Sequence, residues 1–305
     1  NLQIDGGTST LAVRDSSVSG DSVVVLVCTS TVGLITATST VILKPKIPGV
    51  PREIRGALTA FGPIDKIVSD MVLDGRNHDA NNVLVSGSGK FGVSTGESTF
   101  SNDGPAQIGG TDYAVPVGDI APSIPEDPLT VEVNAPWPDG WPTTPDGALG
   151  LPDGTLKSIA LSGVGGSRYV TNFGQLMSDP IQGVTYVEVP PGTEWNAQYI
   201  TVSPPEGILV FHSSSTDAMW WRIKVKDDVP FKGIMILDRV FHLHMDILGA
   251  MIHLSPNTVT DSDCQQNQDH WINYSEETIE NTMSFIDSEM EGGWRDKFEI
   301  VSWWE

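Results

Sequence analysis

The sequence predicts a mainly β protein, with an N-terminal β-hairpin or sheet, then an irregular β-helix or stacked β-sheet domain, and one C-terminal α-helix. Its composition supports this prediction, because 31 glycines and 21 prolines among 305 residues favour short strands and turns over helices. A hairpin pattern near the start, an irregular glycine repeat and one amphipathic stretch near the end define the three parts.

The first element is a predicted β-hairpin at residues 22–43, which read SVVVLVCTSTVGLITATSTVIL. The first strand places one set of residues on a shared face (Val23, Val25 and Val27), and the second strand alternates in the same way (Ile35, Ala37, Ser39 and Val41). The closely spaced prolines that follow cannot continue a ladder of hydrogen bonds. We therefore expect a hairpin domain at residues 1–50 and a larger β-rich domain at residues 51–305.

Residues 103–154 are dense in Pro, Gly and Asp, and they predict an ordered, loop-rich crossing within the larger domain. Three Asp-Gly pairs within residues 136–154 call for tight turns. Trp137 and Trp141 supply apolar anchors, which flexible linkers of Gly and Ser seldom carry.

Four short apolar runs, each opened by a glycine, follow between residues 183 and 254. They begin Gly183-Val-Thr-Tyr-Val, Gly207-Ile-Leu-Val-Phe, Gly233-Ile-Met-Ile-Leu and Gly249-Ala-Met-Ile-His. Such runs are typical of one sheet surface that is built from repeated passes of the chain. Because the spacing varies, both a β-helix and a stack of sheets fit the pattern.

Residues 275–291 form the clearest predicted helix. Ser275 can cap its start, and Glu276 and Glu277 suit the positive end of the helix dipole. Its apolar residues fall on one stripe (Ile279, Met283, Ile286 and Met290). Residues 298–304 then predict a closing strand.

The charge of the chain excludes some partners. Its 39 acidic and 17 basic residues give a formal net charge of -22, and a field of that sign repels nucleic acids and anionic lipids. No run of about 20 apolar residues is present, so we expect no membrane span in this chain. The charge fits an extracellular protein that is kept soluble by repulsion, or one that gathers divalent cations.

The two cysteines, Cys28 and Cys264, fit either one long-range disulfide or two buried thiols. A bridge would close a very long loop and contribute about 4 kcal/mol in the chain-entropy model. An extracellular location favours the bridge.

Two groups of residues are candidate metal ligands. If residues 241–247 form one strand, its alternation places His242, His244 and Asp246 on one face, where they could hold zinc or another transition metal; a polar ladder on a sheet is the other interpretation. A loop rich in oxygen side chains could hold calcium (Asp74, Asn77, Asp79 and Asn81), although it lacks the full EF-hand pattern and also fits a plain turn.

Catalytic motifs are absent from the sequence. It contains no nucleophile elbow, zinc-protease helix, paired-cysteine motif or phosphate loop. We therefore expect a non-enzyme that requires no cofactor, with calcium as the one candidate.

Several segments together resemble bacterial type IV pilus-associated, PilX-like proteins. Residues 26–45 (LVCTSTVGLITATSTVILKP) are similar to the β-hairpin that follows the N-terminal pilin helix in that family. Further segments resemble its later parts, at residues 57–62, 73–79, 91–95, 231–238, 246–252, 273–279 and 301–303.

This resemblance implies an extracellular structural component of a type IV pilus or a similar surface filament: a pilin, a minor pilin or an adhesive subunit. Its partners would be other filament subunits. Members of the family begin with a cleavable leader and a long apolar helix, and Asn1 instead opens into a strand-and-turn sequence. We therefore expect that this helix is removed or is supplied by a separate short helical pilin. In the second case the start of the chain (Leu2, Ile4, Leu11 and Val13) is a candidate docking edge that adds a strand to its partner.

Two alternatives belong to other functional classes. One is a β-helical protein that binds or cleaves carbohydrate, because tryptophans such as those at Trp220-Trp221 and Trp303-Trp304 could stack on sugars. The other is a calcium-dependent adhesion module built on the Asx-rich loop.

Overall fold

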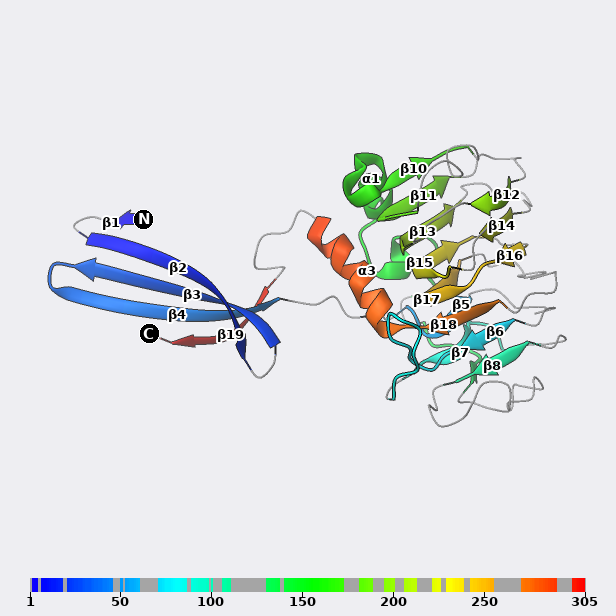
Figure 1. Ribbon diagram of the computed structural model, residues 1–305, viewed down its shortest axis with the longest axis horizontal. Helices are drawn as coiled ribbons and strands as arrows, with labels where there is room; N and C mark the ends of the chain where they lie inside the picture. Colours follow the sequence, from blue (N-terminus) through cyan, green and yellow to red (C-terminus); the bar gives the residue numbers. More distant parts are fainter. Residues whose placement is uncertain are drawn as a thin grey trace. The chain divides into compact units, whose positions relative to one another are not determined.

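A computed structural model gives the fold of the chain as two compact units. The first comprises Asn1–Pro48 and Met290–Glu305, and the second comprises Gly49–Glu289. The structure describes residues 2–4, 7–18, 21–45, 50–51, 53–60, 71–86, 89–98, 100, 106–110, 130–137, 140–172, 181–188, 195–200, 206–212, 221–225, 229–238, 242–254, 270–289 and 298–304. The prediction of a mainly β fold with an N-terminal antiparallel sheet and a C-terminal helix is confirmed (Figure 1).

The first unit is a five-stranded sheet in the order β1-β2-β3-β4-β19. Its strands are β1 (Leu2–Ile4), β2 (Gly7–Val18), β3 (Asp21–Val32), β4 (Ile35–Pro45) and β19 (Phe298–Trp304), and all of its pairs are antiparallel. Gly33 adopts a φ of 61° between β3 and β4, which suits the tight turn of the predicted hairpin. The strand at residues 298–304 pairs with β4 and so completes this first sheet, 253 residues after β4 ends.

The second unit contains a large sheet whose strand pairs are all parallel. Its main path is β10 (Arg168–Val170), β11 (Val184–Glu188), β13 (Glu206–His212), β15 (Phe231–Leu237), β17 (Ile247–His253), β18 (Trp271–Tyr274), β6 (Val72–Asp74) and β8 (Gln107–Gly109). The large sheet branches at β17, which also pairs with β5 (Gly56–Ala60), and β7 (Phe91–Thr95) and β9 (Val131–Glu132) continue from there.

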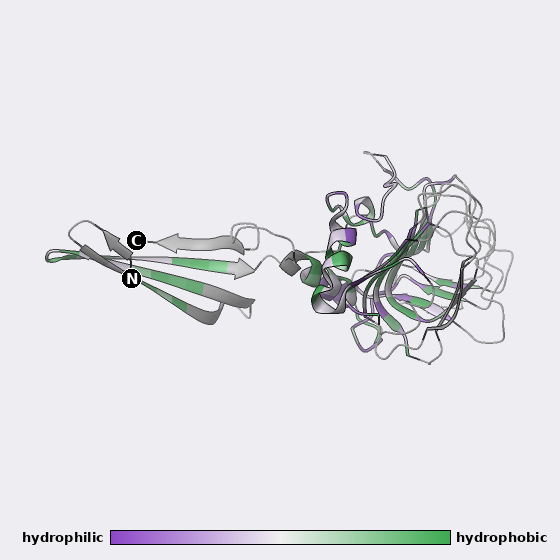
Figure 2. Cartoon of the chain, turned by 90° about the horizontal axis from the view of Figure 1, so that it is seen from above, coloured by the Kyte–Doolittle hydropathy of each residue, from purple (hydrophilic) through white to green (hydrophobic). Residues whose placement is uncertain are grey.

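A second parallel sheet contains β12 (Trp195–Ile200), β14 (Trp221–Val225) and β16 (His242–His244). These strands alternate in sequence with β11, β13, β15 and β17 of the large sheet, so each pass of the chain adds one strand to each sheet. The four predicted glycine-led runs are therefore neighbouring strands of one sheet. Parallel sheets are normally covered on both faces, and most residues of β13, β15 and β17 are buried and hydrophobic. Figure 2 shows hydrophobic residues in the strands of the second unit in green.

The repeat glycines stack directly on one another. Gly207 pairs with Gly233 and Gly233 pairs with Gly249, at φ angles of 118°, 139° and 141°. A Cβ atom on Gly233 would lie 1.9 Å from the carbonyl oxygen of Gly207. Only glycine has both the conformational freedom and the small size that this close approach requires.

The described helices of the second unit are α1 (Thr155–Ser162) and α3 (Glu276–Glu289), with short 3-10 turns at Gly147–Leu149 and Val164–Gly166. The predicted cap of α3 is confirmed, since Ser275 Oγ accepts the N–H of Thr278 at 3.2 Å. Its buried stripe includes Ile279, Met283 and Ile286, and the helix packs beside β13, β15 and β17 (Figure 1). Within the described residues, no helix is long and apolar enough to cross a membrane.

Candidate functional sites

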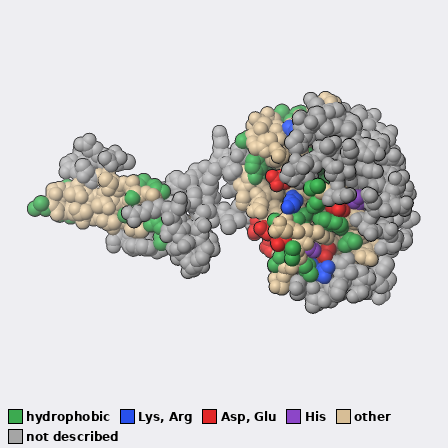
Figure 3. Space-filling view, in the orientation of Figure 1, with side chains coloured by type: hydrophobic (Ala, Val, Ile, Leu, Met, Phe, Trp, Pro, Cys, Tyr) green, Lys and Arg blue, Asp and Glu red, His purple; other side chains and the backbone are tan. Residues whose placement is uncertain are grey.

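The first candidate site is the apolar face of the first unit. Register places one set of side chains from β2, β3 and β4 on this face, which we call the apolar face (Leu11, Val13, Leu26, Val32, Ile35 and Val41). Four of its side chains are more than half exposed, namely Leu11 (64%), Val13 (61%), Val32 (54%) and Ile35 (76%). In Figure 3 hydrophobic side chains also gather at the end of the first unit that carries the β3–β4 turn.

The opposite face of the same sheet is rich in threonine, and we call it the threonine face. Thr29 and Thr38 lie opposite each other with hydroxyl oxygens 3.4 Å apart, and those of Thr31 and Thr36 are 3.1 Å apart. Cross-strand hydroxyl pairs of this kind stabilise a solvated sheet face. By register this face also carries Val25, Val27 and Ile42, which are each half-buried. The exposed apolar side chains of β2, β3 and β4 lie on the apolar face, which is therefore the face that would gain from being covered.

Of the predicted docking residues, Leu11 and Val13 lie on this apolar face. Leu2 and Ile4 belong to β1, whose register pairs them with Ser9 and Gly7 of β2. Strand β1 stands at one end of the strand order of this sheet.

The second candidate site is a group of polar side chains at the carboxyl ends of parallel strands in the second unit. Glu188 ends β11 and is the register partner of His212, which ends β13. Asp238 follows β15 directly, and its backbone N–H donates to the carbonyl oxygen of Phe211. With Lys157 of α1 and Tyr169 of β10 these residues form what we call the rim cluster.

The contacts in the rim cluster are short and partly shielded from water. Lys157 Nζ donates to Glu188 Oε2 at 2.5 Å, and the hydroxyl of Tyr169 donates to the same oxygen. His212 Nδ1 lies 2.8 Å from Asp238 Oδ2, although the two atoms lack the alignment of a hydrogen bond. The result is an imidazole between two carboxylates.

These contacts shift the pKa values of the cluster in opposite directions. Hydrogen bonds from Lys157 and Tyr169 lower the pKa of Glu188. Burial by itself lowers the pKa of His212, but the contact with Asp238 and the charges of Asp238 and Glu188 outweigh burial, so that its pKa is raised.

The two shifts have opposite consequences for stability. The stabilisation from Glu188 is fully present above its unfolded pKa, and it is lost as the pH falls through the lowered pKa of the folded state. The stabilisation from His212 is fully present below its unfolded pKa, and it is lost as the pH rises through the raised pKa of the folded state. Their unperturbed values are 4.5 and 6.5. The cluster therefore stabilises the fold fully between those two pH values.

We expect the substitution Asp238→Asn to lower the pKa of His212, because it removes the nearest negative charge while burial remains. A proton NMR titration of the His212 ring measures this directly. Asp153→Asn, at an exposed carboxylate outside the cluster, is the control and should leave the titration unchanged. An unchanged His212 pKa in Asp238→Asn would show that the Asp238 contact is not made in solution.

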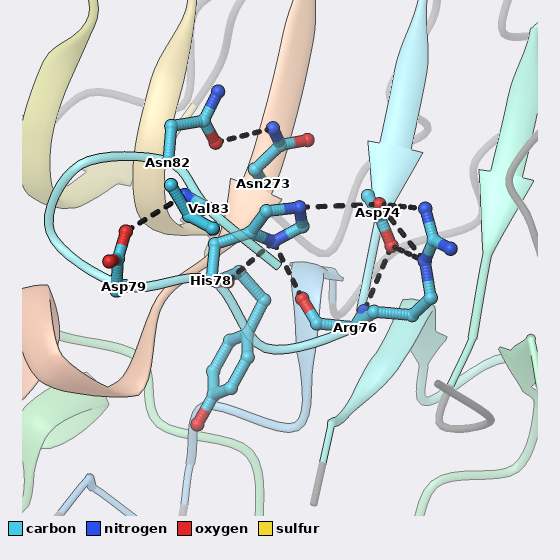
Figure 4. Close-up of polar contacts among 8 residues, drawn as sticks. Asp74, Arg76, His78, Asp79, Asn82, Val83 and Asn273 are labelled. Atoms are coloured by element: carbon cyan, nitrogen blue, oxygen red, sulfur yellow. Dashed lines mark hydrogen bonds and ion pairs between the residues drawn. The ribbon is translucent and has the colours of Figure 1, made fainter. Parts of the chain in front are cut away.

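The oxygen-rich loop that predicts calcium lies between β6 and residue 85, and protein groups donate hydrogen bonds to its side chains (Figure 4). Asp74 accepts from the backbone and guanidinium of Arg76 at 2.8–3.2 Å. Asn77 Oδ1 accepts the N–H of Glu276 at 3.0 Å, and Asp79 Oδ1 accepts those of Asn81 and Val83. The loop thus ties β6 to the start of α3, and calcium binding stays a prediction.

The three residues of the predicted histidine face do not lie in one strand. His242 and His244 lie in β16, whereas Asp246 lies outside any strand, between β16 and β17. The expected single strand is interrupted because the chain passes here from the small sheet to the large one. The carboxylate of Asp246 accepts the N–H of Trp271 at 3.1 Å and lies 3.3 Å from Nδ1 of His270. Among the described residues no three His, Cys, Asp or Glu side chains are grouped to hold a metal.

The predicted disulfide cannot be placed, because Cys264 lies outside the described residues. Cys28 lies in β3, half-buried, and is the register partner of Leu11. Trp220 also lies outside the described residues.

Sequence reasoning missed the rim cluster, although a signal for it exists. Glu188, His212 and Asp238 each follow a repeat glycine by five positions, as the positions of Gly183, Gly207 and Gly233 show. A repeat aligned on its glycines would therefore have placed the three side chains in one row.

Comparison of the chain with protein-family models, with curated proteins and with solved structures found no match.

Proposed function

We propose that this chain is an extracellular structural component of a surface filament of the type IV pilus kind. In this proposal the apolar face of the first unit holds an apolar α-helix of another subunit. The observation that carries the proposal is the exposure of Leu11, Val13 and Ile35 on one face of a sheet whose other face bears paired threonines. The resemblance to PilX-like proteins, which rests on separate short segments, supports the same role.

The dimensions of the apolar face fit a helix. Three neighbouring strands about 4.8 Å apart give a surface about 10–15 Å wide, and a helix with its side chains is about 10–12 Å across. Burial of one Leu or Val side chain contributes about 1.5–3 kcal/mol. Leu11 and Val13 alone would therefore make a strong anchor.

The second unit suits the part of such a subunit that is displayed outward. We interpret its repeated parallel passes as an irregular β-helix, in which the stacked glycines and buried apolar runs make a rigid body. Acidic side chains lie on its visible surface (Figure 3), and the net charge of -22 opposes non-specific aggregation.

We expect the double substitution Leu11→Lys with Val13→Lys to remove the protein from filaments, because two desolvated charges replace two apolar anchors. The loss of about 3 kcal/mol or more corresponds to association weakened at least about a hundredfold. Immunogold electron microscopy of the source cells measures this as gold particles per length of filament.

The matched control is Thr36→Lys with Thr38→Lys, which places the same two charges on the threonine face. This variant should label filaments as the unchanged protein does. Equal labelling of filaments by both variants would contradict the proposal. Self-association of the purified chain that only the Leu11→Lys with Val13→Lys variant abolishes would also contradict it, because the apolar face would then bind a second copy of this chain.

A further inference from the structure

A cavity of about 530 Å³ lies in the second unit, beside the 3-10 turn at Gly147–Leu149. Its lining includes two indoles, one guanidinium and two carboxylates (Trp137, Trp141, Arg55, Glu53 and Asp153). This volume falls in the range of small-molecule sites, which combine aromatic walls with a few fixed polar groups.

The aromatic walls stand at a fixed angle. The rings of Trp137 and Trp141 have centroids 4.3 Å apart and planes inclined at 81°. Trp141 is almost fully buried, whereas Trp137 is half-buried. The two indoles therefore present apolar surface from two directions.

Arg55 is held in place on the cavity wall. Its Nε donates to Glu132 Oε2 at 2.8 Å, and its Nη2 contacts the other oxygen of that carboxylate. Glu132 in turn accepts from Ser94 Oγ at 2.7 Å, and the guanidinium carbon lies 5.7 Å from the ring centroid of Trp137. Because a guanidinium has five N–H groups, the bonds to Glu132 leave others to donate.

The charges of the lining select against ionic ligands. An anion would meet the carboxylates of Glu53 and Asp153, while the guanidinium of Arg55 is already neutralised by Glu132. A cation stacked on Trp137 would meet the guanidinium of Arg55, which already lies over that ring. A neutral ligand avoids both conflicts.

We propose that this cavity binds a neutral saccharide. The C–H face of a pyranose packs on indole rings, and its hydroxyl groups both donate and accept. They can donate to the carboxylates of Glu53 and Asp153 and accept from Arg55. This binding site is independent of the proposed filament role, because it lies in the second unit and the docking face lies in the first.

The test is isothermal calorimetry and tryptophan fluorescence of the full chain with neutral disaccharides (lactose, maltose and cellobiose). We expect at least one of them to bind with a millimolar or lower Kd. Asp153→Asn, an exposed position, and Trp137→Phe, which keeps an aromatic wall, should each weaken that binding at least about tenfold. Trp271→Phe, outside the cavity lining, should leave it unchanged, and a circular dichroism melt checks that every variant is folded.

The absence of heat and of a fluorescence change with all three sugars at 50 mM, on the order of fifty times the expected Kd, would overturn the proposal. Binding of choline or glucuronate in place of the neutral sugars would also overturn it. Binding that survives in Asp153→Asn and Trp137→Phe alike would place the sugar elsewhere.

Discussion

The substitution Gly233→Ala should destabilise the second unit by about 4 kcal/mol. Two costs add at this position. A residue other than glycine at a φ of 139° is strained by about 1–3 kcal/mol, and the new Cβ would lie 1.9 Å from the carbonyl oxygen of Gly207. Relieving that overlap must separate two backbones that are paired along most of β13 and β15, which costs about 1–3 kcal/mol.

The measurement is the melting temperature of the second unit, followed by circular dichroism. For a unit of this size each 1 kcal/mol lowers the melting temperature by about 2–4 °C, so a fall of about 8–16 °C is expected. Gly154→Ala is the matched control, because Gly154 has a φ of 86° and a Cβ added there would meet no atom within 4 Å. It carries the conformational cost of about 1–2 kcal/mol without the overlap.

The difference in melting temperature between the two variants measures the cost of the contact between a Cβ atom at position 233 and the carbonyl oxygen of Gly207. A melting temperature that falls equally in both variants would show that glycine is needed at position 233 only for its positive φ angle. A larger fall in Gly233→Ala would show that the repeat glycines are present because neighbouring passes of the chain touch there.

The local parts of the fold could be predicted from the sequence. The hairpin follows from alternation of Val, Ile and Thr around Gly33, and α3 follows from a cap at Ser275 with an apolar stripe behind it. Both patterns depend on residues close together in the chain. The glycine-led runs also predicted one sheet, because each run contains its own strand signal.

The pairings between distant segments could not be predicted in this way. Strand β17 lies beside β5, about 190 residues earlier in the chain, and β19 returns to β4. Short apolar strands carry no signal for which partner they take, since any of them satisfies the same hydrogen bonds. Register and order depend on the packing of the whole unit.

The candidate sites also differ in whether they depend on residues close together in the chain or on distant segments. Leu11 and Val13 were predicted as docking residues from their place near the start of the chain, and docking there stays a prediction. That the two side chains share one face follows from strand alternation, which the structure shows. The cavity walls come from Glu53 and Arg55 and from residues between Pro136 and Asp153. Only the folded chain brings Arg55 to Trp137 and Glu132. Trp137 and Trp141 were predicted as anchors, and the structure adds that they line a cavity.

The largest electrostatic effect is expected at Asp74, the last residue of β6. Its side chain is almost fully buried, and it accepts from Arg76 through both oxygens. His78 Nε2 lies 3.6 Å from the same carboxylate, while its Nδ1 lies 2.8 Å and 3.2 Å from the carbonyl oxygens of Arg76 and Tyr274. Since a carbonyl oxygen only accepts, Nδ1 carries a proton and fixes the ring.

We expect Asp74→Ala to destabilise the second unit by about 3–5 kcal/mol, because it removes the buried carboxylate that balances the charge of the Arg76 guanidinium, whose side chain is only 12% exposed. Urea unfolding followed by circular dichroism measures this as a lower midpoint with an unchanged slope. The double substitution Asp74→Ala with Arg76→Met should recover part of the loss, since it also removes the positive charge that Asp74 balances in the unchanged protein. Failure of the double variant to recover any stability would show that Asp74 acts through the backbone N–H of Arg76 rather than through its charge.

The same variant separates a structural loop from a calcium site. If the loop is held by protein contacts alone, a chelator leaves the melting temperature of the unchanged protein where it is, and only Asp74→Ala lowers it. If calcium binds among Asp74, Asn77, Asp79 and Asn81, the chelator lowers the melting temperature of the unchanged protein and has no further effect on Asp74→Ala. Asp153→Ala, at an exposed carboxylate of the same unit, should respond to the chelator as the unchanged protein does, so that any difference belongs to the loop.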